Sequence, residues 1–346
     1  MGGISHFSAN IFVLTCLFLF PISIEYVALQ LKINDKGPFN FMVDTGLTTE
    51  MITPHLEHIL GIQETEMKIS GLGTGGASLR TLVPLKGVSL CCGTFADKNQ
   101  QELNLPGDLA AVVVDFPQKH MDPAHDVEGM LGMEALSLFD VDLDFPAGRI
   151  RFWKPGTAAK NAAQKAGMVE IPAVVINESG LYGIRVVNAV PSSPSLQQGQ
   201  QPVLGLIDCG SAFSAVNWAA AGYLGLPTKS DWKKQYANAP AVSALGIDGR
   251  PIMLPTRKTQ LSFVGDARED PSTGVLSFEA PPSNWKQWDP VQLAVGDLPV
   301  FRDLLGDGKT PFLGPASLIG LDILSQRRVI LETGGTRQRR LWVSST

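Results

Sequence analysis

The sequence predicts a mainly β protein made of two related halves, with short helices only. Three observations lead to this fold class. Glycine (35 residues) and proline (24) are frequent between short apolar runs, which is typical of strands joined by turns. One segment of the chain recurs without a gap, and a second recurring segment follows it in the same order in each half. The intervals between these segments have the short, strand-like runs of a β protein rather than long helical periodicity.

The composition is that of a globular chain and excludes several classes of partner. Hydrophobic residues make up 44% of the 346 residues and charged residues 18%, a balance that disordered chains lack. The formal net charge is −5 without a long basic run, so we expect no nucleic acid partner. The four cysteines, and the histidines of "HLEH" (His55 to His58), lack the spacing or the partners of a metal site. We therefore expect no metal and no other cofactor.

An apolar segment occupies the N-terminus, residues 1–24. Its central run from Ile11 to Ile24 is short for a membrane span and suits the core of a signal peptide. However, no Lys or Arg precedes Lys32, so the usual positive start is missing. The alternatives are a secretory signal or anchor, which implies a secretory, lumenal or membrane-anchored protein, and a buried strand or an incomplete start. Under the latter two, the protein would be intracellular or organellar.

The first recurring segment places an aspartate at the end of a strand in each half. "VDTGLTTEMITPHLEHILGI" aligns with "IDCGSAFSAVNWAAAGYLGL", so that Asp44 falls on Asp208 and Gly46 on Gly210, a constant offset of 164 residues. In both copies an apolar strand runs into Asp-x-Gly. A second apolar patch follows, and then a short helix that ends in Leu-Gly.

The second recurring segment divides the chain. "GMLGMEALSLFDVDLDF" resembles "SLIGLDILSQRRVILET", and Gly132 matches Gly320. Each half thus has Asp-x-Gly, a long interval, two apolar residues before glycine, a short helix and a strand. We expect an N-terminal lobe over residues 25–153, an Ala/Lys-rich linker over 154–168, and a C-terminal lobe over 169–346.

Two aspartates at equivalent corners of related halves predict a catalytic pair. Where the corners meet, the carboxylates of Asp44 and Asp208 would face each other and share one proton, because both cannot easily ionise at close range. One carboxylate would activate a water molecule, and the protonated one would hydrogen-bond the carbonyl of the substrate. An amide would then be hydrolysed without a covalent enzyme intermediate.

The residues around the aspartates have physical roles in this scheme. Gly46 and Gly210 allow tight turns and a close approach of the two corners. The hydroxyl of Thr45 is able to hydrogen-bond across the interface and fix the geometry of the pair. Gly132 and Gly320, which lack side chains, would let the second element of each half pass close beneath the aspartate loop.

With both pairs of motifs identified, the chain resembles the aspartic proteases of the retropepsin/pepsin superfamily. "FMVDTG" and "GLIDCGSA" resemble the paired Asp-Thr/Ser-Gly motifs of that family, and "GMLGMEAL" and "SLIGLDIL" resemble its later apolar-apolar-Gly elements. The segment lengths are similar to two retropepsin-type units fused in one chain. The resemblance implies a bilobal acid-protease fold of two pseudo-twofold-related β-barrel lobes. It also implies an aspartic endopeptidase that cuts extended polypeptides and acts as a monomer, an internal pseudo-dimer.

The resemblance further implies a flap in the glycine-rich run from Ile69 to Leu82, with a counterpart at Ser243 to Leu254 in the second half. Part of the first run also fits the G-x-G-x-x-G dinucleotide fingerprint. That fingerprint requires a helix after it, whereas a proline-containing, strand-like run follows here, so we expect no nucleotide. The glycines of the expected flap are Gly71, Gly73, Gly75 and Gly76.

Two departures from the family pattern concern the residues that support the aspartates, and a third is the lack of the pepsin-type flap tyrosine, since no Tyr occurs between Asp44 and Leu136. Cys209 stands where the family has Thr or Ser, and a thiol is a weaker hydrogen-bond partner than a hydroxyl. Leu47 follows the first glycine, where a small residue is usual. In the second copy Ser211 is able to donate to Asp208 and lower its pKa. The alternative function is therefore a catalytically weak or inactive protein that binds peptides on the same fold.

Overall fold

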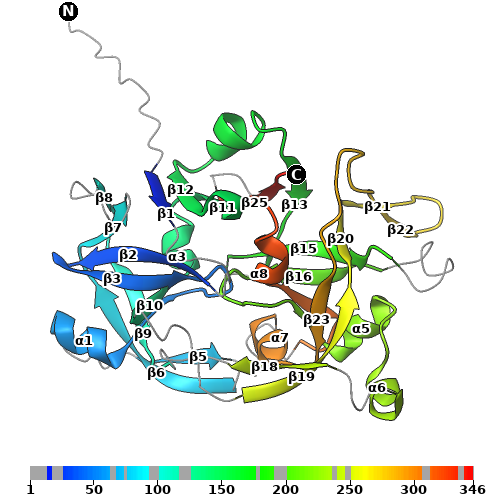
Figure 1. Ribbon diagram of the computed structural model, residues 1–346, viewed down its shortest axis with the longest axis horizontal. Coiled ribbons are helices and arrows are strands. Elements are labelled where there is room, and N and C mark those ends of the chain that lie inside the picture. Colours follow the sequence, from blue (N-terminus) through cyan, green and yellow to red (C-terminus); the bar gives the residue numbers. More distant parts are fainter. Residues whose placement is uncertain are drawn as a thin grey trace, which may run out of the picture.

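A computed structural model shows a mainly β protein, which confirms the predicted fold class (Figure 1). Its strands lie in three large sheets and one two-stranded hairpin, and no described helix is longer than seven residues. The structure describes residues 14–17, 26–62, 68–73, 76–92, 101–116, 126–176, 180–190, 201–235, 240–245, 251–305, 312–333 and 339–345.

The first half forms one nine-stranded sheet in the order β5-β6-β9-β4-β10-β3-β2-β7-β8. Alternating apolar residues place one face of β2 against the core, as its buried and half-buried positions show. The strands are β2 (Val27–Ile33), β3 (Lys36–Val43), β4 (Glu50–Ile52), β5 (Lys68–Gly73), β6 (Gly76–Leu85), β7 (Val88–Cys92), β8 (Gln101–Asn104), β9 (Leu109–Val113) and β10 (Val127–Leu131), and the helices are α1 (Pro54–Leu60) and α3 (Met133–Leu136).

The second half forms another nine-stranded sheet, in the order β14-β15-β16-β24-β17-β23-β19-β18, with β20 paired to β15. The hairpin of β21 (Ala267–Glu269) and β22 (Leu276–Phe278) stands apart from it. The strands are β14 (Val174–Ile176), β15 (Leu181–Asn188), β16 (Val203–Ile207), β17 (Ala215–Val216), β18 (Ala241–Leu245), β19 (Pro251–Thr259), β20 (Leu261–Val264), β23 (Val291–Val295) and β24 (Ala316–Ile319). The helices are α5 (Trp218–Tyr223), α6 (Lys229–Gln235), α7 (Pro299–Leu304) and α8 (Leu321–Leu324).

The two sheets share one topology at their centres. In the first half β10 lies parallel to β3 and antiparallel to β4, and β4 lies parallel to β9. In the second half β24 lies parallel to β16 and antiparallel to β17, and β17 lies parallel to β23. The recurring segments of the sequence therefore correspond to recurring backbone structure, with the aspartate after β3 or β16 and the second glycine after β10 or β24.

The third sheet combines strands from both halves, in the order β1-β12-β11-β25-β26-β13. Its central pairing joins β11 to β25, and β1 of the N-terminal segment pairs antiparallel with β12 at one edge. Among the described residues no helix is long and apolar enough to cross a membrane. The strands are β1 (Leu14–Leu17), β11 (Asp140–Asp144), β12 (Arg149–Trp153), β13 (Val169–Pro172), β25 (Arg328–Glu332) and β26 (Arg340–Val343), with a 3₁₀ turn η1 (Phe145–Ala147) after β11.

The connector between the halves is folded rather than extended. Its centre forms a short π-helix, η2 (Ala159–Ala163), whose alanines pack with Trp153, Ile330 and Trp342 in a small apolar cluster. The carboxylate of Asp140, which belongs to β11, contacts the start of this segment. It accepts backbone N–H groups from Gly156 (3.0 Å), Thr157 (2.9 Å), Ala158 (2.9 Å) and Thr333 (2.9 Å). One fully buried carboxylate thus ties the first half, the connector and the second half together.

A second buried carboxylate in the shared sheet forms an ion pair between the halves. Asp142 on β11 is fully buried, and it accepts hydrogen bonds from Nε (2.7 Å) and Nη2 (2.6 Å) of Arg328 on β25. The indole Nε1 of Trp153 donates to the same carboxylate (3.1 Å), and Arg151 approaches it at 3.3 Å. Because the pair is bidentate and enclosed, its two residues depend on each other.

Candidate active site

The site is built from two loops that leave their strands in the same way. Asp44 follows β3, and its backbone N–H donates to the carbonyl of Leu131 on β10 (3.0 Å). Asp208 follows β16, and its backbone N–H donates to the carbonyl of Ile319 on β24 (3.0 Å). Each aspartate is therefore fixed to the strand that carries the second glycine element of its own half.

Each aspartate also closes a tight turn with its own side chain. Oδ1 of Asp44 accepts the N–H of Gly46 (2.8 Å), and Oδ1 of Asp208 accepts the N–H of Gly210 (2.9 Å). These bonds hold one oxygen of each carboxylate and fix the direction in which the side chain points.

The two loops meet at their glycines. A Cβ atom placed on Gly46 would lie 2.6 Å from Cγ of Asp208, and one on Gly210 would lie 2.3 Å from Cγ of Asp44. No side chain fits at either distance, so each carboxyl group lies directly against the glycine of the opposite loop. The structure thereby brings the two carboxyl groups close together, and both residues are half-buried.

Burial and mutual repulsion favour retention of a proton on this pair. Burial raises the pKa of Asp44 above its ordinary value. Burial and the negative charge of Asp44 raise the pKa of Asp208 well above its ordinary value. Asp208 is therefore the favoured protonated partner, although the macroscopic titration belongs to the pair.

The structure differs here from the sequence-based expectation for Ser211. Its hydroxyl was expected to donate to Asp208 and to favour the charged form. Instead, Oγ of Ser211 donates to the backbone carbonyl of Phe213 (2.9 Å). A serine two residues before a free carbonyl closes a local turn of its own, so its hydroxyl is already engaged.

Two buried side chains tie the loops together from below. Oγ1 of Thr45 donates to the carbonyl of Ile207 (2.9 Å) and accepts the N–H of Cys209 (3.0 Å). In the other direction Sγ of Cys209 donates to the carbonyl of Val43 (3.3 Å). Both side chains are fully buried. Burial raises the pKa of the Cys209 thiol to about 12, so the thiol stays protonated and acts as a donor, not as a nucleophile.

The second glycine of each half lies directly under the aspartate loop. A Cβ atom on Gly132 would lie 3.0 Å from the carbonyl oxygen of Leu47, and one on Gly320 would lie 2.6 Å from that of Phe213. The residue after each glycine donates its N–H to the loop above, from Met133 to Leu47 and from Leu321 to Ser211, both at 2.8 Å. A side chain at either glycine would push these two segments apart.

Each half also carries a β-hairpin in the region expected to form a flap. In the first half β5 pairs with β6, with Gly71 opposite Ser78 and Gly73 opposite Gly76, whereas Gly75 lies outside the described residues. In the second half β18 pairs with β19, and Gly246 of the expected counterpart lies outside the described residues. Figure 1 shows the two hairpins extending toward each other along one side of the molecule.

Sequence reasoning missed one element near the hairpins. Helix α7 of the second half lies against β5 and β6 of the first half, so the first hairpin rests on the opposite lobe. The helix begins with proline at its first turn, which is the sequence signal that was available. Nothing in the sequence indicated that it would contact the other half.

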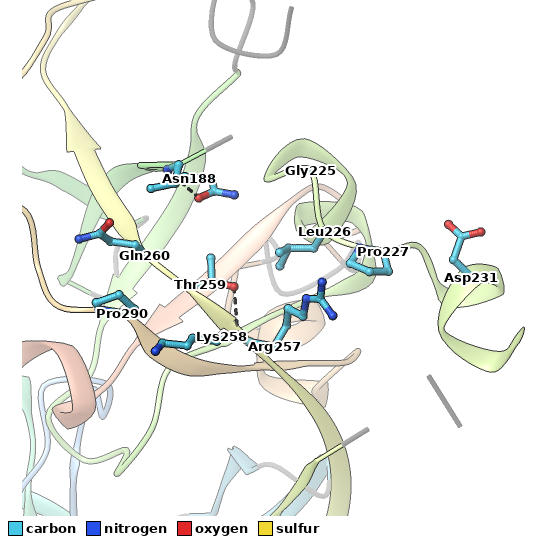
Figure 2. A pocket seen from close by; sticks show the side chains of 11 residues that line it. Asn188, Gly225, Leu226, Pro227, Asp231, Arg257, Lys258, Thr259, Gln260 and Pro290 are labelled. Atoms are coloured by element: carbon cyan, nitrogen blue, oxygen red, sulfur yellow. Dashed lines mark hydrogen bonds between the residues drawn. The ribbon is translucent and has the colours of Figure 1, made fainter. Parts of the chain in front are cut away.

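A pocket of about 680 Å³ lies elsewhere in the second half (Figure 2). None of its lining residues belongs to the aspartate loops, and several of its polar side chains are already engaged by the backbone. Asn188 donates to the carbonyl of Leu224 (2.9 Å), and Gln260 donates to that of Trp288 (2.8 Å). Within the described part of the chain, no group of three or more His, Cys, Asp or Glu side chains is arranged to hold a metal ion.

Comparison with known proteins supports the description of the first half of the chain. Residues 29–135, which include Asp44, match the sequence model of a family described as "Aspartyl protease". No curated protein sequence matches the chain. Among solved structures, the chain is similar to conglutin gamma, a basic 7S globulin from lupine seeds (TM-score 0.49, 11% identity, 97% of this chain and 95% of that chain). It is also similar to the basic 7S globulin from soybean (TM-score 0.47, 11% identity, 97% of each chain). Over residues 29–135, the chain is thus similar in sequence to the aspartyl protease family.

Proposed function

We propose that the protein is an aspartic endopeptidase with Asp44 and Asp208 as its catalytic pair. The observation that carries this proposal is the mutual approach of the two carboxyl groups, each lying against the glycine of the opposite loop. Burial and repulsion keep one proton on such a pair, which supplies an acid and a base side by side. The family match over residues 29–135 supports the part of this assignment that concerns Asp44.

In the proposed reaction Asp44, whose pKa is raised less than that of Asp208, is the base, and Asp208 is the acid. Asp44 takes a proton from a water molecule held between the carboxyl groups, and the oxygen of that water attacks the peptide carbonyl carbon. Asp208 gives its proton to the carbonyl oxygen, so that a tetrahedral diol forms. Asp44 then gives the proton that it took from water to the amide nitrogen, the C–N bond breaks, one diol hydroxyl returns its proton to Asp208, and a carboxylic acid and an amine leave. One water molecule is consumed, and no bond to the enzyme is formed.

The proposed substrate is an extended polypeptide. The hairpins β5–β6 and β18–β19 offer two strand pairs whose backbone groups are suited to hold an extended chain. Because both carboxylates belong to one chain, we propose that a single molecule acts as an internal pair of halves. Neither nucleotide nor nucleic acid takes part in this scheme.

The test is digestion of a denatured protein between about pH 3 and about pH 7, beside the variants Asp44→Asn and Asp208→Asn. We expect the wild type to cut and each variant to lose roughly 10²-fold to 10⁴-fold in rate, the usual contribution of a general acid or base. The amides keep the size of the carboxyl groups, so the fold should survive. If the wild type cuts no faster than both variants at every pH, the proposal is wrong.

The alternative is a protein that binds peptides on this fold without cutting them. The thiol of Cys209, which makes a longer bond (3.3 Å) than the hydroxyl of Thr45 (2.9 Å), favours it, because the pair is held less firmly on that side. Fluorescence anisotropy with a labelled unfolded peptide separates the two functions. Saturable binding without cleavage by the wild type would support the alternative.

A further inference from the structure

A pair of glutamates lies beneath the Asp44 loop, outside the proposed catalytic machinery. Glu50 on β4 is fully buried, and its Oε1 accepts the N–H of Ala135 on α3 (2.9 Å). Its other oxygen, Oε2, is buried without a hydrogen-bond donor among the described residues. The half-buried Glu134 lies close enough to Glu50 for its charge to contribute to the raised pKa of Glu50. Oε1 of Glu134 accepts the N–H of Ala110 (3.1 Å).

The glutamate pair is attached directly to the loop that carries Asp44. The N–H groups of Met133 and Glu134 donate to the carbonyls of Leu47 (2.8 Å) and Thr48 (3.1 Å). The carboxyl group of Glu50 then continues this row of bonds along α3. The start of α3 therefore holds the loop through two backbone bonds and one side chain.

The second half has different side chains at the positions equivalent to the glutamate pair. Glu50 aligns with Ser214, and Glu134 aligns with Asp322. Oγ of Ser214 donates to Oδ1 of Asp322 (2.6 Å) and accepts the N–H of Gly320 (2.9 Å). A hydroxyl has a hydrogen to donate, whereas two ionised carboxylates only accept. The first half therefore lacks one hydrogen that the second half has.

We propose that Glu50 and Glu134 share one proton and that this protonated pair positions the Asp44 loop. The shared proton takes the place of the Ser214 hydroxyl hydrogen and satisfies Oε2 of Glu50. Without it, two negative charges would face each other where the described residues place no cation beside Glu50, a costly arrangement. The glutamates are positioning residues, since they touch neither the water nor the peptide of the proposed reaction.

The charges around Glu50 determine how pH acts on the pair. Of the elements packed against β4, β9 has apolar side chains only, β10 carries Glu128, and α3 carries Glu134. Glu128 is engaged by Thr53 and His55. Burial, with a further contribution from the charge of Glu134, raises the pKa of Glu50 to about 8. The stabilisation from the proton is thus complete below the ordinary pKa of glutamate and is lost as the pH rises to about 8.

The test is the thermal midpoint Tm between about pH 5 and about pH 8, measured in an Asp44→Asn/Asp208→Asn background that removes the titration of the aspartates. We expect Tm to fall as the pH rises in this parent, and the fall to shrink by about 5 °C in Glu50→Gln. A packing role alone would lower Tm equally at every pH and leave the two curves parallel. Parallel curves for both Glu50→Gln and Glu134→Gln would overturn the proposal.

Two further measurements keep the proposal falsifiable if Glu50→Gln fails to fold. The double substitution Glu50→Ser/Glu134→Asp installs the Ser214–Asp322 pair of the second half, and it should fold and show the flatter pH dependence. Infrared spectra of the parent near pH 7 should contain a protonated carboxyl band that Glu134→Gln lacks. An equal band in both proteins would mean that no proton is shared. Neither readout depends on peptidase activity, so the proposal stands or falls separately from the proposed function.

Discussion

Where the two aspartate loops meet, Thr45 holds the opposite loop with a hydroxyl that donates and accepts, whereas Cys209 holds it with a thiol. The backbones of the two halves differ far less. The N–H groups of Asp44 and Asp208 both donate at 3.0 Å to the strand behind them. The same agreement holds at the helix caps, where the N–H groups of Thr53 and Asn217 each donate at 3.0 Å. The glycines and backbone bonds thus define the site, and the side chains around it vary.

At the helix caps the side chains differ between the two halves, although the backbone hydrogen bonds agree. Oγ1 of Thr53 accepts the N–H of Leu56 (3.0 Å) and donates to the buried carboxylate of Glu128 (2.6 Å). In the second half Oδ1 of Asn217 accepts two backbone N–H groups, from Ala220 (2.8 Å) and Ala316 (3.1 Å). The first half uses carboxylates where the second uses neutral groups, as it also does at Glu50. Protonation should therefore affect the first half more strongly.

The largest expected effect concerns the shared sheet. Equivalent positions of the two halves carry Asp142 on β11 and Ile330 on β25, and these two residues are paired across the strands. Arg328→Met would leave Asp142 fully buried without its bidentate partner. We expect a loss of about 3–5 kcal/mol in the free energy of unfolding, measured with urea, because a buried charge loses its bidentate partner and keeps only the longer contact with Arg151 at 3.3 Å. The matched control is Arg340→Met, whose pair with Glu170 is exposed, and it should cost less than about 1 kcal/mol.

Adding Asp142→Leu to Arg328→Met sharpens this test. An apolar pair in place of a buried ion pair is often neutral, so the double variant should recover most of the lost stability. If the double variant is no more stable than Arg328→Met alone, the stabilisation does not come from the ion pair.

The next largest effect is expected from alanine substitutions at the glycines of the two aspartate loops. Gly46→Ala and Gly210→Ala each place a methyl group against the opposite carboxyl group, at 2.6 Å and 2.3 Å from its Cγ. We expect each to lower the free energy of unfolding by about 1–3 kcal/mol through overpacking, with Gly210→Ala the worse, and to reduce peptidase activity at least tenfold. Gly222→Ala in α5 is the control, since its Cβ would meet nothing within 4 Å and alanine favours helix. Equal behaviour of all three would contradict the close approach.

The sequence predicted the parts of this structure that repeat and missed those that occur once. Asp44 and Asp208 were found because both halves present the same motif at one offset, and Gly132 and Gly320 were found in the same way. The ion pair of Asp142 occurs once and joins strands far apart in sequence, so no local pattern indicated it. The orientation of a single hydroxyl, as at Ser211, depends on which carbonyl is nearest. Such choices are made by the folded backbone and leave no trace in residue order.

The smallest effect tests the difference between the loops themselves. Cys209→Thr replaces a sulfur donor 3.3 Å from the carbonyl of Val43 with a hydroxyl, the group that Thr45 uses in the other direction. A hydroxyl donates a shorter and stronger bond, so we expect the free energy of unfolding to rise by up to about 1 kcal/mol and the activity to be equal or higher.

The reverse substitution completes this comparison. Thr45→Cys should lower the free energy of unfolding by about 1–2 kcal/mol, because Oγ1 of Thr45 both donates to Ile207 and accepts from Cys209. Stability from thermal unfolding and activity from peptide digestion are measured on the same preparations. An unchanged stability of Cys209→Thr with a loss of activity would contradict the hydrogen-bond account, since the thiol would then have a role that a hydroxyl cannot fill. If both loops carry hydroxyls and the protein gains in stability and activity, the asymmetry between Thr45 and Cys209 is what limits how firmly the aspartate pair is held.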